Sequence, residues 1–313
     1  MLVGSGVRPS VADLWSRRPH DHRHRPILAR TLGRSWRWLG TPPGTYNRER
    51  ATFERQCVNQ TQGEQATGAA LGPARALGVL SLVAMMGCQV ASGLSARPER
   101  FTGLIVVLLA VCAVAFGAYA WGARRAVAAF GAAVLTGYAA ELAGVLTGFP
   151  FGDYRYTGVL WPQVGGVPVV VALAWGGMGL AAYAVAASVA PAGRWARVCA
   201  GAGALTAWDL FLDPQMVRLG LWAWARDGAY RGVPWTNFAG WLLVSALVML
   251  VIGRVSRDAG PDRGLLALYT VMAVMETVAF AAVFDPPDPL VAAAGGIAMG
   301  AFAAPAWRRS WRR

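Results

Sequence analysis

Four carboxylates lie inside long apolar stretches of this 313-residue chain: Glu141, Asp209, Asp213 and Glu276. An ionisable group at the centre of a membrane-spanning helix costs about 2.5–3.5 kcal/mol on insertion scales, and such groups usually face the bundle interior. Two carboxyl groups close together in a water-poor pocket can place a protonated acid beside an ionised base. The sequence therefore predicts general acid and base chemistry around these residues.

The spacing of the acidic residues indicates how they meet. Asp209 and Asp213 are four residues apart, so on a helix they share one face, one turn from each other. Glu141 has Tyr138 about one turn before it on the same face. Asp153 follows in the segment Pro-Phe-Gly-Asp-Tyr and is a further candidate.

Each carboxylate also has a structural interpretation. A buried carboxylate can simply bond a neighbouring helix, which applies to Glu141 and Asp209 and most of all to Glu276, around which there is no recognisable motif. Asp213 precedes Pro214, and a proline disfavours helical conformation in the residue before it, so Asp213 can mark a helix end. Asp153 can belong to an exposed turn. Both interpretations stay open for the sequence alone.

The composition indicates the elements that position these residues. The chain is 56% hydrophobic and only 14% charged, against roughly 45–50% apolar in an ordinary soluble domain. Apolar stretches recur at the length of about 20 residues that a bilayer demands. We expect an all-α, polytopic transmembrane bundle of about eight helices, with seven as the alternative count. The predicted spans are 74–94, 103–122, 126–147, 166–190, 194–213, 238–253, 265–284 and 289–307.

Arginines mark one side of this predicted bundle. They gather in the tails and in alternate connections, at Arg124, Arg125, Arg194, Arg197, Arg254, Arg257, Arg263, Arg308, Arg309, Arg312 and Arg313. The bias is incomplete, since the opposite side carries Arg97, Arg100, Arg155, Arg218, Arg226 and Arg231. By the positive-inside rule the side with more arginines is the cytoplasm. We therefore expect a multi-pass protein of the cell (plasma) membrane with both termini cytoplasmic. The four carboxylates then lie in one layer, in the middle to outer part of the bundle.

Three regions follow from this pattern: a disordered basic cytoplasmic tail at 1–72, a transmembrane helical domain at 73–307, and a basic cytoplasmic C-terminal tail at 308–313. The histidines of the first region, His20, His22 and His24, belong to a charged flexible stretch rather than a metal site. Topology and lipid headgroups explain the net charge of +13, so we expect membrane lipids and no nucleic acid as partners.

Two outer connections are dense in aromatic residues, glycine and proline: 148–164 and 214–237. Tryptophan and tyrosine at this depth are typical of the interfacial belt. Alternatively, the two segments fold back over a cavity, which is permitted where protein or water satisfies the backbone. The sequence does not decide between the two.

The sequence lacks the motifs that several kinds of catalysis require. The chain has no GxSxG or HExxH motif, no glycine-rich phosphate loop, and no histidine after His24. Histidine-based catalysis and the usual haem and di-iron ligand sets are therefore excluded from the apolar region. We expect no cofactor and no metal.

Ordered motifs between Glu141 and Trp241 resemble the carotenoid 1,2-hydratase family of bacteria and haloarchaea. They are Glu141-Leu-Ala-Gly144, Thr147-Gly-Phe-Pro-Phe-Gly-Asp153-Tyr-Arg-Tyr-Thr157, Gly166-Val-Pro168 with Trp175, Trp208-Asp209-Leu-Phe-Leu-Asp213-Pro-Gln-Met216, Trp222-Ala-Trp224, Gly228-Ala-Tyr230 and Gly232-Val-Pro234-Trp-Thr-Asn237-Phe-Ala-Gly240-Trp241. The resemblance implies cofactor-independent addition of water to the C1–C2 double bond of an acyclic carotenoid end group, which leaves a tertiary alcohol. Lycopene, γ-carotene or a C50 precursor would be the substrate, and other carotenoid enzymes are candidate partners.

The chemistry of this reaction suggests roles for the residues. Hydration needs an acid that protonates the alkene, a base for the water, and aromatic faces that stabilise the cation. We expect Asp209 or Glu141 to be the acid, and the other, or Asp213, to orient and deprotonate water, with Asp153 in support. The expected substrate-binding residues are Tyr138, Tyr154, Trp175, Trp208, Trp222, Trp224, Tyr230 and Asn237, and Trp161 is a further candidate for lining the site.

Three other functions remain as alternatives. A membrane prenyltransferase would use the Asp209 and Asp213 pair in a magnesium diphosphate site, although it needs a second acidic cluster. A carotenoid end-group cyclase also begins by protonating an alkene. A proton-coupled transporter fits intramembrane carboxylates, but no inverted repeat is visible.

Overall fold

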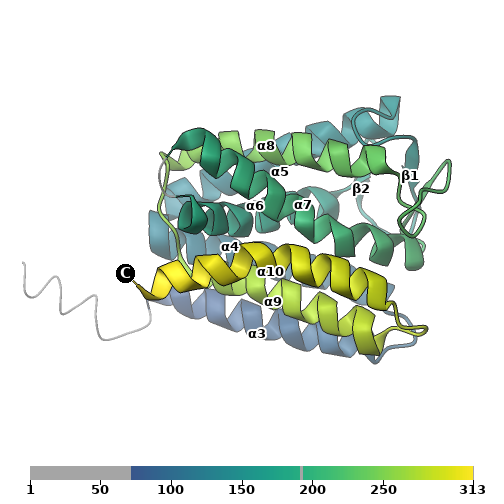
Figure 1. Cartoon of the computed structure of the whole chain (residues 1–313), viewed down its shortest axis with the longest axis horizontal. Coiled ribbons are helices and arrows are strands. Elements are labelled where there is room, and N and C mark those ends of the chain that lie inside the picture. Colours follow the sequence, from purple (N-terminus) through teal and green to yellow (C-terminus); the bar gives the residue numbers. More distant parts are fainter. Residues whose placement is uncertain (1–71, 191–192, 313) are drawn as a thin grey trace, which may run out of the picture. The chain divides into compact units, whose positions relative to one another are not determined.

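The computed structural model describes residues 72–190 and 193–312. Over these residues the helices are α3 (Pro73–Gly93), α4 (Glu99–Trp121), α5 (Ala123–Thr147), α6 (Val169–Val189), α7 (Arg194–Arg218), α8 (Trp235–Ser256), α9 (Arg263–Val278) with the π-helical turn η3 (Ala279–Val283), and α10 (Pro289–Trp311). The predicted basic tail and its histidines lie outside the described residues, apart from Gly72, which precedes α3. Figure 1 shows the helices running side by side along one direction.

The predicted all-α membrane bundle is confirmed. Seven of the eight long helices in the described part of the chain are long and apolar enough to cross a bilayer. The remaining helix is α7, which carries three arginines and two aspartates among its 25 residues. The helix with the candidate catalytic aspartates is thus the least apolar one, as expected if it faces the bundle interior rather than lipid.

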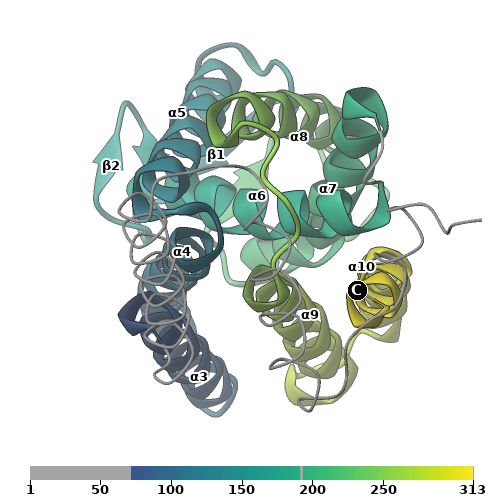
Figure 2. The same ribbon diagram turned by 90° about the vertical axis from the view of Figure 1, so that its left-hand side faces the viewer.

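Helix α6 is the centre of the bundle. It packs against α4, α5, α7, α8, α9 and α10, and most of its residues are buried. Figure 2, viewed towards one end of the helices, shows α6 enclosed by the others. Its small residues, among them Gly176, Gly177 and Gly179, let neighbouring helices approach closely. The aromatic Trp175 at its first half is therefore held in a rigid frame.

Helix α7 does not end at Asp213, so that prediction was wrong. The helix passes through Pro214 and continues for one further turn to Arg218. A proline has no backbone N–H, so the carbonyl of Leu210, four residues earlier, loses its helical partner. The hydroxyl of Tyr230 donates to that carbonyl at 3.0 Å. A tyrosine from the following connection thus satisfies the helix at its proline.

The two aromatic connections form short strands at the end of the bundle opposite the C-terminus (Figure 1). Strand β1 (Tyr154–Tyr156) pairs with β4 (Trp222–Trp224) in antiparallel register, with Tyr154 opposite Trp224 and Tyr156 opposite Trp222. Strands β2 (Gln163–Val164) and β3 (Val167–Pro168) form a small hairpin beside them. The connections therefore fold back and pair with each other, as the second interpretation expects.

Candidate active site

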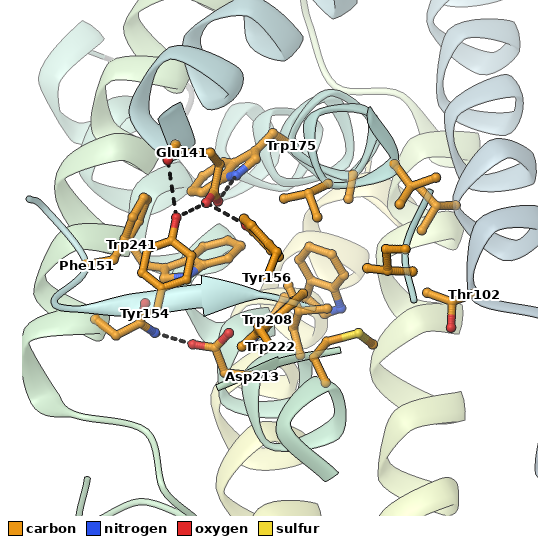
Figure 3. Close-up of a pocket in the computed structure, with 18 of the residues that line it drawn as sticks. Thr102, Glu141, Phe151, Tyr154, Tyr156, Trp175, Trp208, Asp213, Trp222 and Trp241 are labelled. Atoms are coloured by element: carbon orange, nitrogen blue, oxygen red, sulfur yellow. Dashed lines mark hydrogen bonds between the residues drawn. The ribbon is translucent and has the colours of Figure 1, made fainter. Parts of the chain in front are cut away.

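A buried cavity of about 60 Å³ lies beneath the β1–β4 ribbon (Figure 3). Its wall comes from α4, α5, α6, α7 and α8 and from both aromatic connections. Among the lining residues are two carboxylates and a dense set of aromatic side chains: Glu141, Asp213, Phe151, Tyr154, Tyr156, Trp175, Trp208, Trp222, Trp224 and Trp241. The wall is therefore apolar apart from a few converging polar groups, which is typical of a ligand site.

Glu141 is held by three hydrogen-bond donors. The hydroxyls of Tyr154 and Tyr156 donate to its Oε2 at 2.5 and 2.7 Å, and the indole Nε1 of Trp175 donates to its Oε1 at 2.9 Å. Figure 3 shows these three side chains converging on the carboxyl group. Because an ionised carboxylate has about four acceptor sites, one of them on Oε1 stays available. Glu141 is thus arranged as an acceptor with room for one more donor.

Glycines lie one helical turn before and about one turn after Glu141 on the same face of α5, and their small size lets the aromatic donors come close to its carboxyl group. Gly137 lies one turn before Glu141, and a Cβ there would lie 2.3 Å from Cγ of Trp175. Gly144 lies about one turn after it, and a Cβ there would lie 2.8 Å from the hydroxyl oxygen of Tyr154. Any larger residue at either position would displace a donor from Glu141.

Tyr154 and Tyr156 reach the same carboxyl group because residues two apart on a strand point to the same side. Burial, followed by the nearby charge of Glu141, raises the pKa of both phenols well above the usual value. The two hydroxyls therefore stay protonated and act as donors at any physiological pH. Their rings pack across the ribbon against Trp224 and Trp222, with centroids 5.2 and 5.6 Å apart.

Asp209 and Asp213 form a second polar group, on α7. The amide Nδ2 of Asn237 donates to Oδ2 of Asp209 at 2.8 Å and also to Oδ2 of Asp213. The two carboxyl groups therefore share one donor, and Oδ1 of Asp209 is buried without a hydrogen-bond partner. Both are buried, and Asp213 lines the cavity. In Figure 3, Glu141 and Asp213 lie on either side of the Tyr154 ring.

Aromatic rings form the rest of the wall. Trp175 and Trp241 are stacked with centroids 4.1 Å apart, and Trp208 meets Trp241 edge to face at 6.1 Å. The indole Nε1 atoms of Trp208 and Trp224 are buried and have no hydrogen-bond partner. Both residues line the cavity, so they are donors for a bound water or hydroxyl group.

The structure gathers most of the predicted site residues. Glu141, Asp213, Tyr154, Trp175, Trp208, Trp222, Trp224 and Asn237 line the cavity, and Asp209 lies directly behind it. Four predicted residues lie elsewhere: Asp153 and Trp161 are exposed, the Tyr138 hydroxyl donates to the Val164 carbonyl at 3.3 Å, and Tyr230 bonds α7 as described. Glu276 lines a second cavity.

Two important residues were missed by sequence reasoning, Tyr156 and Trp241. Both had a signal. Tyr156 alternates with Tyr154 on one strand, and Trp241 follows Asn237 by one helical turn, so each shares a face with a predicted residue. Among the described residues, no three His, Cys, Asp or Glu side chains gather in a way that could hold a metal ion.

The fold and the site define a class: a multi-pass helical membrane protein with a buried pocket of paired acids and aromatic rings. The family described as carotenoid biosynthesis protein matches residues 102–302, which is more than half of the chain. The chain belongs to this carotenoid biosynthesis family.

One curated relative has an activity in its name. The bisanhydrobacterioruberin hydratase of Haloarcula japonica is 35% identical over 144 residues, which cover 45% of this chain and 47% of that protein. The matched region thus spans about half the length of that relative. No solved structure is significantly similar to the chain.

Proposed function

We propose that this protein is a membrane carotenoid hydratase, which adds water to the C1–C2 double bond of an acyclic carotenoid end group without a cofactor. The observation that carries the proposal is the pocket itself. It sets a carboxylate that accepts from three donors and keeps one acceptor site free, Glu141, and a carboxyl pair, Asp209 and Asp213, around an apolar space walled by indole and phenol rings. The hydratase relative and the family membership support the same reaction class.

The aspartate pair supplies the acid. Two buried carboxyl groups one helical turn apart share a proton more readily than they both ionise. Asp213 lines the cavity, so it is the member that reaches the alkene, and Asp209 lies behind it and shares the Asn237 donor. Asp213 gives its proton to C2, and the electron pair of the double bond forms the new C–H bond. A tertiary cation is left at C1.

Glu141 supplies the base. Three of its acceptor sites are taken by Tyr154, Tyr156 and Trp175, and the remaining one accepts a hydrogen bond from water. That water attacks C1 through its oxygen, and its proton passes to Glu141. Proton exchange with water then returns both acids to their starting state, so the net change is one water added.

The aromatic wall stabilises the intermediate. A cation over an indole or phenol face gains about 2 kcal/mol or more when the site is desolvated. Trp222 and Trp224 on the ribbon and Trp175 and Trp241 on the helices line the cavity and are the candidates for this role. The unpartnered Nε1 atoms of Trp208 and Trp224 fit the hydroxyl of the product.

The location of the protein is part of the proposal. In the sequence, the connections at the end of the bundle away from the pocket and the C-terminal segment carry eleven arginines, against six in the connections at the pocket end, so we place the far end in the cytoplasm and the pocket towards the outer face of the cell membrane. A carotenoid substrate enters from the bilayer and can pass between enzymes that act on the same lipid.

The proposal is tested by expressing the chain in cells that accumulate lycopene or a C50 precursor. Hydration gives a product heavier by one water, detected by mass spectrometry. A product of unchanged mass supports a cyclase instead, and the gain of a prenyl unit supports a prenyltransferase. Either result, or no product at all from a protein that is present in the membrane, refutes the hydratase assignment.

Variants test the acid and base roles. Asp213→Asn and Glu141→Gln keep the shape of each side chain and remove its proton chemistry, and general acid and base catalysis contributes about 10²–10⁴-fold in rate. We expect losses in that range from each. The matched control is Asp227→Asn, an exposed carboxylate on the same connection as β4. Full activity in both site variants would contradict the assignment.

A further inference from the structure

A second cavity lies beside the reaction pocket. It has a volume of about 190 Å³ against about 60 Å³ for the pocket, and it lies among α3, α4, α7, α9 and η3. Five residues of α4 and α7 line both spaces: Thr102, Val106, Trp208, Leu212 and Met216. The two cavities therefore adjoin at these five side chains.

The second cavity has a mainly apolar wall with two unpaired polar atoms. Oε1 of Gln89 on α3 and Oε2 of Glu276 on α9 are buried and have no hydrogen-bond partner. Nε2 of Gln89 lies 3.6 Å from Sδ of Met272, one turn before Glu276, so both side chains reach the same region of the wall. Each unpaired buried group is destabilising, so this pair needs an explanation.

We propose that the second cavity binds the adjoining segment of the same isoprenoid lipid, and that Gln89 and Glu276 hydrogen-bond a hydroxyl group on that segment. The identity of the lipid rests on the proposed function. The apolar wall suits a hydrocarbon chain. A hydroxyl group both donates and accepts, so it matches a carboxyl and an amide side chain together.

The site would make the protein selective for an oxygenated lipid. A pocket built to hydrogen-bond a hydroxyl group rejects an analogue without it, because its own buried polar groups are then left unpaired. A single neutral hydrogen bond to such a group corresponds to roughly tenfold in affinity.

The test measures two affinities on the full-length protein in detergent micelles. The probes are two acyclic carotenoids of equal length, one with a hydroxyl group at one end and one with none, and binding is followed by quenching of tryptophan fluorescence. Trp208 lines both cavities and is a suitable reporter. We expect the hydroxylated probe to bind about tenfold more tightly.

Gln89→Leu and Glu276→Leu should each bring this ratio close to one. The matched control is Ser245→Ala, which removes an unpaired buried hydroxyl that lines neither cavity and should leave the ratio unchanged. A misfolded variant loses both affinities rather than their ratio. If Glu276→Leu does not fold, Gln89→Leu carries the test.

A ratio near one in the wild type, or a ratio that survives Gln89→Leu, would overturn the proposal. The same preparations are assayed for hydration. Selective binding without any gain of water supports the hydroxyl site and refutes the hydratase assignment. Hydration without selective binding supports the hydratase assignment and refutes the hydroxyl site. The failure of one proposal can therefore be told apart from the failure of the other.

Discussion

Replacing Tyr230 by phenylalanine tests how the connection after α7 supports the site. The Tyr230 hydroxyl donates at 3.0 Å to the carbonyl of Leu210, which Pro214 leaves without a helical partner. Tyr230 is almost fully buried, and burial raises the pKa of its phenol to about 12, so it is a neutral donor. Tyr230→Phe keeps the ring and leaves this carbonyl without a donor.

The expected destabilisation is about 1–3 kcal/mol, the cost of leaving a buried acceptor unpaired. Unfolding in sodium dodecyl sulfate mixed micelles, followed by tryptophan fluorescence, measures it. The control is Tyr119→Phe on α4, since that tyrosine is half exposed and surface substitutions usually stay within about 0.5 kcal/mol. A destabilisation no larger than that of the control would contradict the reasoning.

A double-mutant cycle tests whether the Tyr230 hydroxyl acts through the carbonyl of Leu210. Pro214→Ala restores a backbone N–H four residues after Leu210, so this carbonyl regains a helical partner. Tyr230→Phe should then cost less than 1 kcal/mol in the Pro214→Ala background, which gives a coupling energy of about 1–2 kcal/mol. An unchanged cost in that background would show that the hydroxyl acts elsewhere.

Two further substitutions test other contacts by the same unfolding assay. Tyr156→Phe removes one of three donors to Glu141 and should cost about 1.5–3 kcal/mol, the range for a hydrogen bond to a charged group; stability equal to the wild type would refute this. Asp288→Asn keeps the N-cap of α10 but loses the ion pair with Arg231, worth about 0.2–1 kcal/mol. The hydrogen bond from Arg231 lowers the pKa of Asp288, so the wild-type advantage should be present at neutral pH and disappear as pH falls through that lowered pKa; an advantage that persists in acid would contradict it.

Helix positions were the most predictable part of the fold. Each apolar stretch became a helix, and most ends shifted by only a few residues, because membrane spans must satisfy their backbone internally. The end of α7 was predicted wrongly at Asp213. The local rule for proline is correct, but a distant tyrosine, Tyr230, bonds the carbonyl that Pro214 leaves free. No local pattern contains that contact.

The sequence identified the acidic residues that gather at the candidate site, but only some of the aromatic residues around them. Glu141, Asp209 and Asp213 were identifiable because an ionisable side chain inside a membrane-spanning helix costs free energy, and such a residue is usually kept for a function. Asp153 was grouped with them by its motif, yet it is exposed at the end of β1. Which aromatic side chains turn inward depends on the pairing of β1 with β4, and that register joins segments far apart in the chain.

The central claim is that the added oxygen comes from water through acid and base chemistry in this pocket. The most direct test incubates the purified protein with an acyclic carotenoid under argon in heavy-oxygen water and analyses the product by mass spectrometry. We predict one heavy oxygen per hydrated end group, formed by the wild type and greatly reduced in Asp213→Asn. Product that forms only when dioxygen is admitted, or whose oxygen is unlabelled, would contradict the account.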